Sequence, residues 1–139
     1  VPVKATTSPE AAGRGADIVI TVTPSKTPYV MDGWIRDGMH VNAFGADAHG
    51  KQELDKATYR RAKLVTDNVE VALEKELFER KDIYGELGEL ATGTKRGRES
   101  PKELTIFDST GLGIQDVAAA SLAFEKAKKH GIGKWVKFI

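Results

Sequence analysis

The chain has 139 residues, enough for one domain with an apolar core, and 40% of them are hydrophobic. Its 21 basic and 20 acidic residues leave a formal net charge of +1, which favours neither nucleic acid nor an anionic membrane as a partner. The absence of cysteine excludes disulfides, thiolate metal sites and cysteine nucleophiles. No stretch approaches the roughly 20 apolar residues of a membrane-spanning helix.

The first half of the chain alternates between helix and strand patterns. Ser8-Pro9-Glu10 predicts the start of a short helix, because it combines a hydroxyl cap, a proline in the first turn and an acid. The β-branched run from Asp17 to Val22 predicts a strand buried on both faces, as in a parallel sheet. The other segments expected here are a strand at 1–5, a helical turn at 32–35, strands at 39–44 and 63–66, and a helix at 55–61. This alternation predicts an α/β fold with a parallel sheet.

The second half carries longer helical patterns. Apolar residues at helical spacing predict a helix over 68–81, with Lys75 and its charged neighbours on a solvated face. The segments expected after it are a helix at 86–90, a strand at 104–107, a long helix from about 114 to 129, and a terminal strand at 135–138.

A loop of small residues follows the strand that ends near Phe44. Glycine or alanine at positions 45, 46, 48 and 50 lets a ligand approach the main chain, and Asp47 stands among them as a lone carboxylate. A carboxylate in that place is positioned to handle a proton. The ordinary alternative is that Asp47 is a simple loop acid.

Two other loops are candidates for ligand binding. Hydroxyls cluster at 21–25, at the carboxyl end of a strand, where ligands lie in open α/β sheets. Alternatively, Thr23 and Ser25 satisfy turn amides. Gly111-Leu112-Gly113 lies between a strand and a helix, as a phosphate-binding loop does. A complete G-x-G-x-x-G motif would need a third glycine where Asp116 stands, so we expect no dinucleotide fingerprint here.

Histidines and acids near this loop give no metal-site pattern. His40, Asp47 and His49 show no compact ligand spacing, and no metal site is expected. Lys51 and Glu53 are expected to be surface charges on the way into the next helix.

Four segments occur in the same order as in the ornithine cyclodeaminase/mu-crystallin family, which the chain resembles over nearly its whole length. They are A-D-I-V-I-T-V-T-P-S (16–25), H-V-N-A-F-G-A-D-A-H-G-K-Q-E-L-D (40–55), E-L-G-E-L (86–90) and T-I-F-D-S-T-G-L-G-I-Q-D-V-A-A-A (105–120). The last segment looks especially like the archaeal alanine dehydrogenase branch. His49 stands where family members usually carry proline.

The resemblance implies a domain organisation. Family members have a Rossmann domain for NAD(P) and a second domain for substrate binding and dimerisation. Residues 1–112 would be the later part of the Rossmann domain, and residues 113–139 a helix and strand that join the second domain. The glycine loop, the acid that reads the ribose, and the substrate-binding lysine and arginine would lie upstream. We therefore expect the isolated chain to bind NAD weakly and to be inactive.

The resemblance also implies roles for residues in three loops. Asp47 matches the catalytic aspartate that acts on the substrate amine. The cofactor-binding positions that it implies are Thr23, Pro24 and Ser25 in the first loop, Asn42, Phe44 and Gly45 beside the nicotinamide, and Ser109, Thr110 and Gly111 in the loop that closes over it.

The activity expected first is oxidative deamination of L-alanine to pyruvate and ammonia, with NAD or alternatively NADP as cofactor. The second is cyclisation of L-ornithine to L-proline with release of ammonia. Both reactions begin with hydride loss from an amine-bearing carbon, which needs a base, so this part of the site does not separate them. A third alternative is a non-catalytic, mu-crystallin-like NADP-binding protein. A cytoplasmic homodimer with a small amino-acid substrate is expected for the complete protein.

Overall fold

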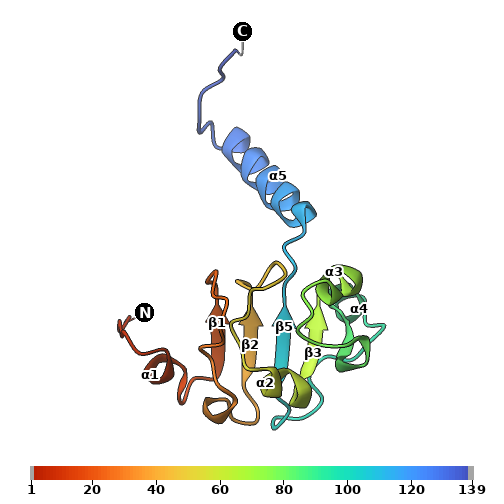
Figure 1. Cartoon of the computed structure of the whole chain (residues 1–139). Helices are drawn as coiled ribbons and strands as arrows, with labels where there is room; N and C mark the ends of the chain where they lie inside the picture. Colours follow the sequence, from red (N-terminus) through yellow and green to blue (C-terminus); the bar gives the residue numbers. More distant parts are fainter. Residues whose placement is uncertain (1, 138–139) are drawn as a thin grey trace.

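A parallel sheet forms the centre of the computed structural model, which describes residues 2–137. Its five strands lie in the order β1-β2-β5-β3-β4, and every pairing is parallel. The strands are β1 (Ile18–Thr21), β2 (His40–Ala43), β3 (Lys63–Thr66), β4 (Ile83–Glu86) and β5 (Thr105–Asp108). Figure 1 shows that their carboxyl ends meet along one edge. The expected α/β fold with a parallel sheet is therefore confirmed.

Short helices connect the strands, and a long one follows β5. They are α1 (Pro9–Gly13), α2 (Lys56–Arg61), α3 (Val69–Leu73), α4 (Leu87–Ala91), α5 (Gly113–Lys129), and the 3-10 turns η1 (Asp32–Trp34) and η2 (Arg80–Asp82). Ser8 caps α1 and Asp55 caps α2 through their side chains, as their sequence positions predict. No helix within residues 2–137 is both long and apolar enough to cross a membrane.

The core lies between one face of the sheet and the segments around α2. Alternate residues of the central strands point into it, among them Val41, Leu64 and Ile106. Tyr59 brings its ring from α2, and the ring of Phe78 packs against it with centroids 5.3 Å apart.

The edge strand β1 differs from its prediction. Ile18, Ile20 and Val22 are 60–69% exposed, so the strand is not buried on both faces. Its other face, with Val19 and Thr21, points inward. The exposure follows from the place of β1, which pairs with β2 alone in the described sheet.

Four further segments depart from the sequence prediction. The helix predicted over 68–81 is interrupted after Leu73, and Glu76 adopts a positive φ of 57°. The strand β4 was not predicted, because it is short and flanked by charged residues. Residues 2–5 and 135–137 form no strand, and residues 1 and 138 lie outside the described part of the chain.

The helix α5 leaves the carboxyl edge of the sheet and points away from it (Figure 1). None of its residues is buried. Large apolar side chains along and beyond it, including Ile114, Phe124 and Trp135, are 51–85% exposed. An amphipathic helix with an uncovered apolar face needs a further surface to pack against.

Candidate active site

The three loops predicted to bind ligand lie together at the carboxyl edge of the sheet. The loop residues at 23–25, 44–45 and 109–111 follow β1, β2 and β5, which are neighbours in the sheet, and Asn42 lies near the end of β2. Strand pairing brings Thr21 opposite Ala43, and Ala43 opposite Asp108. Parallel strands present their carboxyl ends on one side, which is where ligands bind in open α/β sheets.

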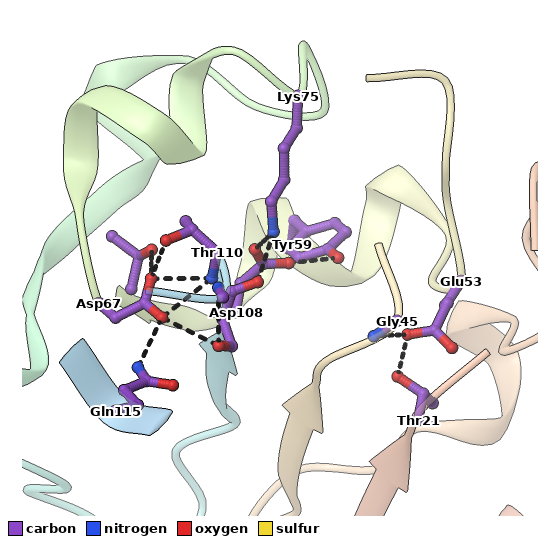
Figure 2. Close-up of polar contacts among 12 residues, drawn as sticks. Thr21, Gly45, Glu53, Tyr59, Asp67, Lys75, Asp108, Thr110 and Gln115 are labelled. Carbon is purple, nitrogen blue, oxygen red and sulfur yellow. Dashed lines mark hydrogen bonds and ion pairs between the residues drawn. The ribbon is translucent and has the colours of Figure 1, made fainter. Parts of the chain in front are cut away.

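Glu53 joins the first two loops from below. Its buried carboxylate accepts hydrogen bonds from the Thr21 hydroxyl at 2.7 Å and the Gly45 amide at 2.8 Å (Figure 2). It also accepts one from the Thr23 amide at 2.6 Å. The hydroxyls of Thr23 and Tyr29 also donate to it, at 2.8 and 2.9 Å. Burial raises the pKa of Glu53, but these donors outweigh burial and lower that pKa overall. Glu53 is therefore a buried anion that ties two loops together, and its prediction as a surface charge was wrong.

Gly45 lies against the first loop more closely than any side chain would permit. A Cβ at this position would stand 2.1 Å from the Thr23 carbonyl oxygen and 2.4 Å from Glu53 Oε1. The predicted close approach of the main chain at Gly45 is thus made, in this structure, to the neighbouring loop.

Asp47 is the exposed carboxylate of this edge. Its side chain is 51% exposed, and its Oδ1 lies 2.5 Å from Lys51 Nζ. The hydrogen bond from Lys51 lowers the pKa of Asp47, so the group is ionised at neutral pH and is able to accept a proton. Its neighbour His49 contacts Glu76 at 3.3 Å on the surface.

Asp108 ends the central strand β5 in a buried ion pair. Its Oδ1 lies 2.5 Å from Lys75 Nζ, which also donates to the Ser109 carbonyl oxygen at 2.7 Å. The Tyr59 hydroxyl donates to Asp108 Oδ2 at 2.9 Å (Figure 2). Burial raises the pKa of Asp108, while Lys75 and Tyr59 act in the opposite direction. Lys75 is only 3% exposed, so its assignment to a solvated helix face was wrong.

Asp67, at the end of β3, binds the loop that follows β5. It accepts hydrogen bonds from the Ser109 hydroxyl, from the amide and hydroxyl of Thr110, and from Gln115 (Figure 2). Gly111 follows with a φ of 75°, a conformation that favours glycine.

The remaining predicted residues have local partners. The Ser25 hydroxyl donates to the Thr27 carbonyl oxygen at 2.6 Å and accepts from the Thr27 amide at 3.3 Å, so Ser25 satisfies a turn amide, whereas the Thr23 hydroxyl donates to Glu53. The Asn42 side chain contacts His40 at 3.2 Å. Phe44 stays 39% exposed, and its ring meets that of Phe107 edge to face, with centroids 5.9 Å apart.

Sequence reasoning missed Glu53, Asp67, Lys75 and Asp108, which hold the three loops in place. Apart from Gly45, eight residues from Glu53, the partners described above are 24 to 49 residues away along the chain, so no local pattern marks them. One available signal was the position of Asp67 and Asp108 at the ends of apolar strands.

Comparisons with known proteins place these features in context. The family model described as "Ornithine cyclodeaminase/mu-crystallin family" matches residues 1–131. An alanine dehydrogenase of Archaeoglobus fulgidus is 41% identical over 145 aligned residues, covering 98% of this chain and 45% of that protein. A Bacillus cereus delta(1)-pyrroline-2-carboxylate reductase is 38% identical, covering 88% of this chain and 41% of that protein.

Solved structures of the same two kinds of enzyme are also similar to this chain. An archaeal alanine dehydrogenase dimer with bound NAD superposes with a TM-score of 0.80 at 44% identity, covering 94% of this chain and 43% of that one. The Thermococcus litoralis delta(1)-pyrroline-2-carboxylate reductase, in complex with NADH and L-proline, gives 0.82 at 38% identity, with coverages of 94% and 44%. The chain therefore spans less than half the length of the relatives it matches.

Proposed function

Because the chain belongs to the ornithine cyclodeaminase/mu-crystallin family, we propose that it forms part of an NAD(P)-dependent enzyme that oxidises an amino acid at its amine-bearing carbon. L-Alanine is the substrate we propose first. The alanine dehydrogenases among the relatives share 41% and 44% identity with this chain, against 39% for an uncharacterised cyclodeaminase of Sinorhizobium fredii and 28% for a lysine cyclodeaminase structure. The observation that carries the proposal is the half-exposed carboxylate of Asp47, which is paired with Lys51.

Asp47 alone among four acids at the carboxyl edge is suited to meet a substrate. Glu53 and Asp108 are fully buried, and Asp67 accepts hydrogen bonds from the adjacent loop. The carboxylate of Asp47 is half exposed and carries only the Lys51 ammonium as a side-chain partner among the described residues. A substrate ammonium has the same charge and donors as Lys51 Nζ, so it is able to replace it.

The residues near Asp47 fit the nicotinamide end of the cofactor. Phe44 offers partly exposed aromatic surface, and Gly111 leaves the third loop without a side chain at its turn. Residues 2–137 contain no complete G-x-G-x-x-G motif for the pyrophosphate. When bound, NAD⁺ supplies the hydride acceptor. The role we assign to Asp47 is to hold the substrate amine and take up its proton as the imine forms.

We also propose the domain organisation that the family resemblance implies. Residues 1–112 would belong to the cofactor domain, and residues 113–139 would lead into the substrate and dimerisation domain. The exposed apolar residues of α5 support this division, because they need a further surface to cover them. A homodimer is proposed because the archaeal alanine dehydrogenase structure is a dimer.

A substrate comparison tests the proposed function. The complete protein is incubated with NAD⁺ and either L-alanine or L-ornithine. Alanine oxidation consumes water and NAD⁺ and yields pyruvate, ammonium, NADH and a proton, so absorbance from NADH rises in proportion to pyruvate. Cyclodeamination of ornithine returns the hydride, so ammonia and proline accumulate without net NADH.

A stoichiometric rise with alanine is the expected result. Ammonia from ornithine at constant absorbance would instead establish the cyclodeaminase alternative. Tight cofactor binding without product from either amino acid would contradict both reactions and favour the binding-protein alternative. NADH oxidation with delta(1)-pyrroline-2-carboxylate is a second arm, since reductases of that substrate are 38% identical to this chain.

A further inference from the structure

We propose that Asp67 is a positioning residue that holds the loop Ser109–Gly111 in the shape that meets the nicotinamide. This inference rests on the proposed function, because it assigns cofactor contact to that loop. Asp67 itself lies beneath the loop and is not proposed to touch the cofactor.

The geometry of the contact is specific to this loop. The two Asp67 oxygens lie 2.8 and 3.0 Å from the Thr110 amide nitrogen, and Oδ1 lies 2.5 Å from the Thr110 hydroxyl. The Ser109 hydroxyl donates to Oδ2 at 2.9 Å. Ser109 and Thr110 are 3% and 6% exposed, so these bonds form away from bulk water. Charge-assisted hydrogen bonds of this kind are stronger than neutral ones.

The donor set requires a carboxylate. The groups that face Asp67 donate to it: one backbone amide, the hydroxyls of Thr66, Ser109 and Thr110, and the Gln115 side-chain nitrogen. A carboxylate has two acceptor oxygens, whereas an asparagine has one oxygen and an amino group that would oppose these donors. Asp67→Asn therefore changes the hydrogen bonding of the loop while almost preserving side-chain volume.

The same carboxylate also reaches the start of α5. Gln115 lies in the first turn of that helix, and its Nε2 donates to Asp67 Oδ2 at 3.1 Å. Gly111 lies between the two attachment points and has a positive φ. Because glycine has no side chain, this stretch of backbone has little restraint of its own. Asp67 thus holds both ends of the turn that connects the sheet edge to α5.

On the other side of the loop, Lys75 donates to the Ser109 carbonyl oxygen at 2.7 Å. Asp67 binds the side chains of the loop and the Thr110 amide, whereas Lys75 binds the loop's main chain. The loop is therefore held from two directions. Preorganisation of this kind lowers the cost of ordering a binding loop when the ligand arrives.

The test is a double-mutant cycle in the complete protein, read by NADH binding. The variants are Asp67→Asn, Thr110→Val and the combination of both. Asp55→Asn is the matched control, because it removes one carboxylate charge from a cap position that asparagine also fills. Fluorescence titration gives the Kd for NADH, and hydrogen exchange of peptides over 105–115 reports on the loop.

We expect Asp67→Asn to weaken NADH binding about 10-fold or more and to accelerate exchange over 109–115. In the Thr110→Val background the same change should have a clearly smaller effect, because the two residues act through one contact. Asp55→Asn should stay within twofold of wild type. The proposal is overturned if Asp67→Asn binds NADH within twofold of wild type, or if its effect is the same in both backgrounds.

Two outcomes separate this inference from the proposed function. If wild-type protein does not bind NADH, the proposed function fails, and unchanged loop exchange in Asp67→Asn would then overturn the positioning role as well. If Asp67→Asn does not fold, Ser109→Ala and Thr110→Val carry the test through hydrogen exchange, since each removes one donor to Asp67. Each should accelerate exchange over 109–115, and exchange at the wild-type rate in both variants would overturn the inference.

Discussion

Replacement of Gly45 by alanine should destabilise the protein strongly, because no space exists for a methyl group between the first two loops. The added Cβ would lie 2.1 Å from the Thr23 carbonyl oxygen and 2.3 Å from the Thr23 amide nitrogen. Both are backbone atoms, so no side-chain rotation relieves the contact. The loops must move apart, and the Glu53 carboxylate that joins them then loses partners.

The expected loss of unfolding free energy can be calculated from these contacts. Overpacking at a tight site costs about 1–3 kcal/mol. Loss of one hydrogen bond to the buried Glu53 carboxylate, from Gly45 or Thr23, adds about 1.5–3 kcal/mol. We therefore expect a loss of at least about 2.5 kcal/mol. At roughly 3 °C per kcal/mol for a protein of this size or larger, Tm should fall by at least about 7 °C.

Thermal unfolding followed by circular dichroism measures this effect. Gly88→Ala is the control, because Gly88 lies in α4 with no atom within 4 Å of its added Cβ. Alanine is the better helix former, so this variant should gain about 0.5 kcal/mol. A Gly45→Ala protein with a Tm within about 2 °C of wild type would refute the argument that the loops are locked together at this position.

Three further predictions concern the acids of the sheet edge. Asp47→Asn should lower kcat about 100-fold or more while NADH still binds, and unchanged turnover would reject Asp47 as the base. Lys75→Met should lower the unfolding free energy by about 3–5 kcal/mol, because Asp108 then stays buried without its counter-ion. The double variant Lys75→Met with Asp108→Asn should recover most of that loss. A double variant no more stable than Lys75→Met alone would contradict the pairing. Burial raises the pKa of Asp67, but its donors lower it overall below the ordinary 3.8, so its stabilising effect is present above that pH and is lost on acidification. The difference in unfolding free energy between wild type and Asp67→Asn should therefore shrink below about pH 4 in urea titrations, and a constant difference would argue against the ionised contact.

Local sequence patterns predicted much of the sheet and several helix starts correctly. The caps at Ser8 and Asp55, the β-branched runs and the long pattern of α5 each depend on neighbours within a few residues. The predicted helix over 68–81 failed for a non-local reason. Lys75 leaves the helical path to reach Asp108, and Phe78 packs against Tyr59. Tertiary contacts of this kind override helix propensity.

The candidate site also combines residues that the sequence could predict with residues that it could not. The loops that face a ligand follow strands whose patterns are visible in the sequence, and the resemblance assigned their residues. The acids beneath those loops could not be assigned, because an aspartate or glutamate between strands is usually solvated. What distinguishes Glu53 is a set of donors brought from Thr21, Thr23 and Gly45 by the fold itself.

The place of β5 in the sheet dictates the order in which this chain assembles. Among the strands within residues 2–137, β5 is the last to be synthesised, yet it lies between β2 and β3. Until residue 105 has emerged, the pairs β1–β2 and β3–β4 have no strand to bridge them, and Lys75 and Asp67 have no partners at Asp108 and Thr110. Such non-local pairing slows folding and leaves strand edges open in the meantime. A nascent chain stalled before β5 is therefore the form of this protein most exposed to aggregation and to capture by chaperones.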